Sequence, residues 1–183
     1  RLNQRLAAAY YLGVAPITGT PGTPHVNGIG NAFEYAVKMR QFPPDATLDR
    51  LEAQGRLTAS QIEAVAATVA RFHLQGCTRA DADSAWGDPQ QVWQPIAHNF
   101  LQIGLLRAEP ADRRQLDALQ RWSEDQHARL TPLLAARKRD GFVRECHGDL
   151  HLGNLAWVDQ QVLVFDCLEF NPGLRWIDIV CEI

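Results

Sequence analysis

The chain has 183 residues, of which 46% are hydrophobic and 21% are charged, and its formal net charge is −3. This length and composition are typical of one globular domain, or of one domain with part of another, and they exclude a collagen-like, low-complexity or disordered chain. The negative net charge argues against a general nucleic-acid-binding role.

The N-terminal region predicts one helix end and two strands. Residues 1–11 carry apolar side chains at helical spacing, and no N-cap precedes Arg1, so we expect the end of a helix that starts before this residue. Because the first residue is Arg and not Met, we expect the chain to be a fragment or a processed product. Residues 12–18 predict a short strand, which Pro16 would place at a sheet edge. Residues 19–31 are rich in Gly, Pro and Asn and predict a loop or hairpin turn, whereas alternating apolar residues predict a half-buried strand over 32–40.

The middle of the chain predicts helices. A short helix is expected at residues 45–54, and the next begins at the capping box formed by Ser60 and Glu63 and ends at Gly76. Two longer helices follow, and Pro132 is expected to kink or divide the second; they are predicted at residues 89–106 and 111–139.

The last forty residues change character. Two strands are predicted at 154–158 and 162–165, around a turn at 159–161, and a final helix is predicted from residue 173 onward. A few strands, then mostly helices, then a β-hairpin indicate an α+β fold.

The segment from His147 to Asn154, His-Gly-Asp-Leu-His-Leu-Gly-Asn, leads into this hairpin, whose second strand ends at Asp166. With the turn centred on Gln160, Asn154 would stand opposite Asp166, and directly opposed Cβ atoms lie about 4.5–5.5 Å apart. An amide oxygen and a carboxylate at that distance can hold one Mg²⁺ ion. A bulge in the turn would shift this register by one residue.

Asp149 lies five residues before Asn154, in a glycine-containing loop from which its carboxylate can reach the same site. A carboxylate beside a Mg²⁺-bound phosphate can orient an acceptor hydroxyl and take its proton. The catalytic loop of protein kinases follows the same logic. The pattern therefore predicts ATP-dependent phosphoryl transfer to a hydroxyl group.

Other readings of these residues stay open. Cys146, His147, Asp149 and His151 offer donors for a metal-dependent hydrolase, although no second histidine pair completes such a site. His147 is interpreted as a buried structural imidazole. His151 is either a surface residue or a substrate contact, and Glu169 is either a carboxylate behind the metal site or a charge at the end of the hairpin.

The motif resembles the aminoglycoside phosphotransferase and choline-kinase-like family. The segments DCLEFNPGLRWIDI, RLNQRLAAAYYLGVAPIT and EYAVKMRQFP are similar to bacterial aminoglycoside-phosphotransferase-like proteins that are often fused to an AAA-type ATPase domain. The resemblance implies a protein-kinase-like fold. Residues 1–44 would be a remnant of the N-terminal lobe with part of its sheet, and residues 45–183 a mainly helical C-terminal lobe, truncated at its end, that carries the catalytic β-hairpin.

The resemblance also implies roles for individual residues. Asp149 would be the catalytic base, and Asn154 and Asp166 would hold Mg²⁺. Asp178, expected in the final helix, would brace the catalytic loop together with His147. The strand at 32–40 would lead to a hinge at which Arg40 and Phe42 present backbone groups to the adenine of ATP.

The sequence departs from the family in one respect. The family's Gly-rich loop, phosphate-binding lysine and partner glutamate precede the first helix and are not among these residues, and Lys38 is interpreted as a solvent-facing strand residue. A non-catalytic kinase-like module that regulates a fused or associated ATPase is therefore the alternative function. The helical insert at 76–140 has nine acidic and nine basic residues, so nothing there selects a cationic aminoglycoside over another small hydroxyl compound.

The remaining features concern location. The four cysteines form no Cys-x-x-Cys pair, which favours reduced thiols in a cytoplasmic protein. No run approaches the roughly 18–20 apolar residues that a membrane span needs, so we expect no membrane partner and no nucleic-acid partner.

Overall fold

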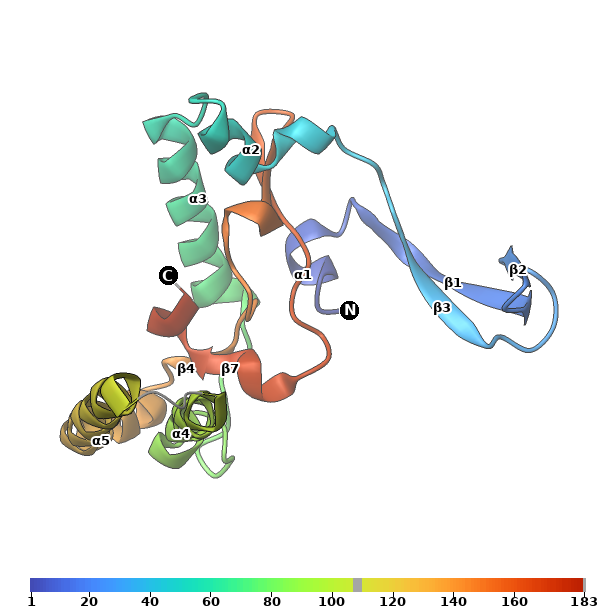
Figure 1. The fold of residues 1–183 in the computed structure, drawn as a ribbon. Coiled ribbons are helices and arrows are strands. Elements are labelled where there is room, and N and C mark those ends of the chain that lie inside the picture. Colours follow the sequence, from blue (N-terminus) through green and yellow to red (C-terminus); the bar gives the residue numbers. More distant parts are fainter. Residues whose placement is uncertain (107–109, 183) are drawn as a thin grey trace. The chain divides into compact units, whose positions relative to one another are not determined.

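The computed structural model describes residues 1–106 and 110–182 (Figure 1). It contains both helices and antiparallel strands, which confirms the α+β class. The chain divides into two compact units. Unit 1 comprises Arg1–Gly76 and Asp149–Glu169, and unit 2 comprises Cys77–Gly148 and the segment from Phe170 onward. The lobe boundary at residue 44 stays a prediction.

Unit 1 begins with α1 (Gln4–Ala7) and a three-stranded sheet of order β2-β1-β3, formed by β1 (Tyr11–Thr20), β2 (Thr23–Val26) and β3 (Glu34–Met39). The helix is shorter than predicted, because Tyr11 already begins the strand. Pro16 lies in the central strand, not in an edge strand as predicted. It is accommodated because β2 pairs with β1 only from Ile17 onward, and on that side Pro16 contributes only its carbonyl oxygen, which accepts the N–H of Asn27 at 2.8 Å.

The outer face of this sheet is exposed. Val14 stands opposite Val37, and Pro16 stands opposite Tyr35. Val14, Val37 and Tyr35 are 67%, 55% and 63% exposed, so the prediction of a half-buried strand is right about the strand and wrong about its burial. In Figure 1 the sheet extends away from α1 and the other helices of unit 1.

The helices of unit 1 are α2 (Leu48–Ala53) and α3 (Ala59–Arg71), and a single π-helical turn continues α3 over Phe72–Gly76. The predicted capping box is wrong by two residues. The Thr58 backbone is extended, so Thr58 caps α3: its hydroxyl accepts the N–H of Gln61, and the Gln61 side chain accepts the N–H of Thr58.

The core of unit 1 forms around a hairpin of β5 (Leu155–Val158) and β6 (Gln161–Val164). The opposed residues Leu155 and Val164 are buried with Leu48 and Leu51 of α2. The next opposed pair, Ala156 and Leu163, is buried with Ala7 and Tyr11. Alternate residues therefore pack on opposite faces of the hairpin, as strand geometry requires.

Unit 2 contains α4 (Pro89–Leu106), α5 (Pro110–Arg139) and a small sheet of β4 (Val143–Glu145) with β7 (Trp176–Asp178). Both long helices are confirmed, and α5 continues through Pro132 as one helix. The two helices pack together, since the His127 Nε2 lies 2.8 Å from the carbonyl oxygen of Pro89.

The helix predicted from residue 173 is wrong over its described part; Ile183 lies outside the described residues. Short 3₁₀ turns occupy Pro172–Leu174 and Ile179–Glu182, and between them β7 pairs with β4. None of the helices in the described ranges combines the length and the apolar composition that crossing a bilayer requires.

Candidate functional site

The loop from Asp149 to Asn154 brings the predicted base and one predicted metal ligand together. It ends in a 3₁₀ turn, Leu152–Asn154, that leads directly into β5. The buried Asn154 amide donates to the Asp149 carbonyl oxygen at 2.9 Å and to the Asp149 carboxylate at 3.3 Å. The Asp149 side chain is 56% exposed, so a substrate can reach its carboxylate.

The direction of these hydrogen bonds decides what Asn154 can offer a metal. Its NH₂ group faces Asp149, so its side-chain oxygen is turned away from that residue. Within the described residues, no donor is hydrogen-bonded to this oxygen. A neutral oxygen with free lone pairs is a suitable ligand for Mg²⁺.

Asp166 lies one residue beyond the position expected for it. Leu155 pairs with Val164, and the N–H of Phe165 donates to the Asn154 carbonyl oxygen at 3.1 Å, so Phe165 stands opposite Asn154. The prediction that Asp166 faces Asn154 directly is therefore wrong by one residue. The reason is the turn, which has two residues, Asp159 and Gln160, both with positive φ (50° and 63°), instead of the three predicted.

Asp166 itself leaves the strand conformation, with a φ of 62°. Its N–H donates to the Tyr11 hydroxyl at 2.9 Å, and no described residue is paired with its exposed carboxylate. The structure thus places both predicted metal ligands at the same end of the hairpin, each with an oxygen available. The donor set of one carboxylate and one amide oxygen fits a hard cation.

Two residues that the sequence analysis did not single out hold the end of the hairpin. The side chain of buried Asn3 accepts the N–H of Cys167 at 2.7 Å and donates to Glu169 at 2.8 Å. Tyr11 holds Asp166 and lies in the core, where burial raises the pKa of its hydroxyl. Nothing in the sequence around Asn3 or Tyr11 indicates that these residues bind the end of the hairpin.

His151 lies beside Asp149. Its Nδ1 accepts the N–H of Gly153 at 3.1 Å, so the proton of the neutral ring is assigned to Nε2, which lies 3.7 Å from the Asp149 carboxylate. The ring is 58% exposed. This geometry places His151 next to the predicted base, and its role as a surface residue or a substrate contact stays open.

The two predicted hinge residues make contacts within unit 1. The N–H of Arg40 donates to the Tyr10 carbonyl oxygen at 2.8 Å, and the adenine contact of either backbone stays a prediction. The ring of Phe42 packs against the rings of Phe165 and Tyr10, at centroid distances of 5.1 and 6.1 Å. Lys38 is exposed on β3, as interpreted.

In unit 2, the side chain hydrogen-bonded to the predicted catalytic loop is Glu182, whereas the hydrogen bonds of Asp178 among the described residues go elsewhere. The buried Glu182 carboxylate accepts the N–H of Gly148 at 2.7 Å. Gly148 has a φ of 89°, and a Cβ there would lie 2.9 Å from the Cβ of Arg175, so only glycine fits. His147, the preceding residue, is fully buried. The sequence signal for a buried role of Glu182 is that it is the one acidic residue of the otherwise apolar segment Ile179–Glu182.

Asp178 ends β7 and is fully engaged elsewhere. Its carboxylate accepts two bonds from Arg137 of α5, at 2.6 and 2.8 Å, and one from the N–H of Val180 at 3.0 Å. The bond to Asp178 raises the pKa of Arg137. Asp178 therefore links α5 to the C-terminal segment.

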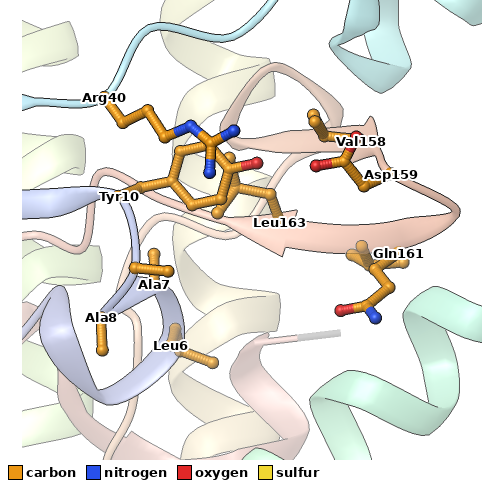
Figure 2. Close-up of a pocket in the computed structure, with 11 residues that line it drawn as sticks. Leu6, Ala7, Ala8, Tyr10, Arg40, Val158, Asp159, Gln161 and Leu163 are labelled. Atoms are coloured by element: carbon orange, nitrogen blue, oxygen red, sulfur yellow. The ribbon is translucent and has the colours of Figure 1, made fainter.

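A cavity of about 440 Å³ lies at the opposite, turn end of the hairpin (Figure 2). Arg40, whose guanidinium lies 5.6 Å from the centre of the Tyr10 ring, faces Val158, Asp159 and Leu163 across it. Asp149, Asn154 and Asp166 do not line this cavity, so it is separate from the candidate catalytic end.

Comparison with known proteins agrees with the motif. Residues 10–181 match the model of the phosphotransferase enzyme family. Uncharacterized proteins of Mycobacterium bovis and of two strains of Mycobacterium tuberculosis are each 27% identical over 177 residues, which is 97% of this chain and 34% of each relative. The chain thus spans about a third of the length of these relatives, and no solved structure matches it. Because the family match covers nearly the whole chain, the chain belongs to the phosphotransferase enzyme family.

Proposed function

We propose that the chain is part of a small-molecule kinase that transfers the γ-phosphate of ATP to a substrate hydroxyl with the help of Mg²⁺. The family implies a protein-kinase-like fold and a phosphotransferase activity. The observation that carries the finer proposal is the bond from the Asn154 amide to Asp149, because it holds the base and leaves the amide oxygen for the metal.

The roles of the residues follow from their surroundings. Asp149 would hold the acceptor hydroxyl and take its proton as the oxygen–phosphorus bond forms and the bond to ADP breaks. Asn154 and Asp166 would hold Mg²⁺, which when bound neutralises the charge of the phosphates. Glu182 and His147 would support the loop, and the Arg40 carbonyl would face adenine.

The setting of this activity is part of the proposal. About two thirds of each relative lies outside the matched region, which leaves room for the fused or associated AAA-type ATPase domain that the resemblance implies. The four cysteines form no disulfide, which is typical of the cytoplasm, where ATP is made.

The first test is thermal unfolding of the chain with ATP, with and without Mg²⁺. A ligand at a hundred times its dissociation constant adds about 2.7 kcal/mol of stability. We expect a Mg²⁺-dependent rise in Tm that Asp166→Ala removes and that Asp83→Ala, a change of another exposed aspartate, preserves. A rise of equal size in Asp166→Ala would contradict the metal assignment.

The second test is phosphate transfer from ATP to a panel of hydroxyl compounds. Asp149→Asn keeps the shape of the base but cannot take a proton, so we expect turnover to fall by about 10²- to 10⁴-fold while the Mg²⁺–ATP shift is retained. Full turnover in this variant would refute the base. Absence of both the shift and turnover would favour the alternative, a non-catalytic module that regulates an ATPase.

A further inference from the structure

Unit 2 contains a cavity of about 290 Å³ whose lining is mostly apolar. The loop after α3 contributes Trp86, α4 contributes Val92 and Pro95, and the C-terminal segment contributes Leu174, Trp176 and Ile177. The planes of the Trp86 and Trp176 indole rings differ by 11°, and their centroids are 6.3 Å apart, so the two rings are stacked nearly parallel to each other. This volume is at the lower end of small-molecule pockets.

The polar groups of this cavity carry no free charge. Asp178 is the one carboxylate among the described residues that line it, and Arg137 neutralises it through two hydrogen bonds. The Gln91 amide, the Cys181 thiol and glycine backbone remain to contact a ligand. A polycation would therefore lose its hydration without gaining a free carboxylate, whereas a flat neutral molecule would bury its surface against the indoles.

We propose that this cavity binds a small, neutral, aromatic alcohol. The backbone of Gly148 forms part of its wall. Glu182 and the crowding around Gly148 fix the conformation of that part of the wall.

The test measures binding and not turnover. Tryptophol, 2-phenylethanol and 2-(2-naphthyl)ethanol, at millimolar concentration, serve as neutral aromatic probes in calorimetry and ligand-observed NMR, with kanamycin as the polycationic comparison. We expect at least one aromatic alcohol to bind more tightly than kanamycin. Val92→Trp fills the cavity and should weaken that binding at least tenfold. Val180→Trp adds the same side chain at an exposed site of unit 2 and should leave it unchanged.

Trp86→Ala removes one of the two indole rings without filling the cavity, and it keeps the test decisive if Val92→Trp does not fold. Binding by none of the three alcohols, or equal binding in Trp86→Ala or Val92→Trp, would overturn the inference. Alcohol binding without a Mg²⁺–ATP shift would uphold the cavity and refute the kinase. A Mg²⁺–ATP shift without alcohol binding would uphold the kinase and refute the cavity.

Discussion

Two β structures of unit 1 carry apolar strand residues in opposite environments. In the β5–β6 hairpin, the opposed residues Leu155 and Val164 are 3% and 2% exposed. In the β2-β1-β3 sheet, the opposed residues Val14 and Val37 are 67% and 55% exposed. The hairpin is covered by Leu48 and Leu51 of α2, whereas the β2-β1-β3 sheet extends away from the helices of unit 1 (Figure 1). Apolar strand residues thus contribute to the core only where other elements pack on them.

The largest effect is expected in the hairpin. Leu155→Ala should lower the free energy of unfolding by about 2–5 kcal/mol, because it opens a cavity between β5 and α2. Urea denaturation followed by circular dichroism measures this change. A loss below about 1 kcal/mol would mean that the hairpin is not the centre of the core.

An intermediate effect is expected at Tyr11, which begins β1 and packs against Ala156 of the hairpin. Tyr11→Phe removes the acceptor for the Asp166 N–H and should lower the free energy of unfolding by about 1 kcal/mol at neutral pH.

The same variant should change the response to alkali. Burial raises the pKa of Tyr11 above its ordinary value of 10.0, so the unfolded chain loses this proton first. The free energy of unfolding should fall as the pH rises above that value, and by less in Tyr11→Phe. Urea denaturation at about pH 8 and about pH 10.5 compares the two proteins. Equal slopes would show that Tyr11 titrates as in the unfolded chain.

The smallest effect is expected in the β2-β1-β3 sheet. Val37→Thr keeps the β-branched shape of an exposed strand residue, so the free energy of unfolding should change by no more than about 0.5 kcal/mol. The same urea assay applies. A loss near that of Leu155→Ala would show that another surface covers Val37 in solution.

The sequence predicted the order of the elements better than their partners. The long helices and the hairpin follow from local periodicity and turn residues, which a window of the chain contains. Local pattern did not reveal that the C-terminal segment forms a strand that pairs with β4. This pairing joins residues far apart in sequence, as the hydrogen bond from the Cys146 N–H to the Arg175 carbonyl oxygen does. The contact of Asn154 with Asp149 spans five residues and was therefore within reach.

The rest of the site was less predictable for the same reason. The bonds of Asn3 to Cys167 and of Tyr11 to Asp166 connect opposite ends of the sequence. Glu182 rather than Asp178 meets the loop because the segment after β7 forms a 3₁₀ turn instead of the expected helix, which changes which side chain points toward Gly148.

The two-residue turn at Asp159 and Gln160 has a consequence for how this chain can evolve. The turn fixes which residue stands opposite Asn154, and a change of register by one residue reverses the face of every side chain in a strand. An insertion or deletion of a single codon there would exchange the residues that β6 packs on its two faces and would displace Asp166. Substitutions in the turn should therefore be tolerated far better than changes in its length.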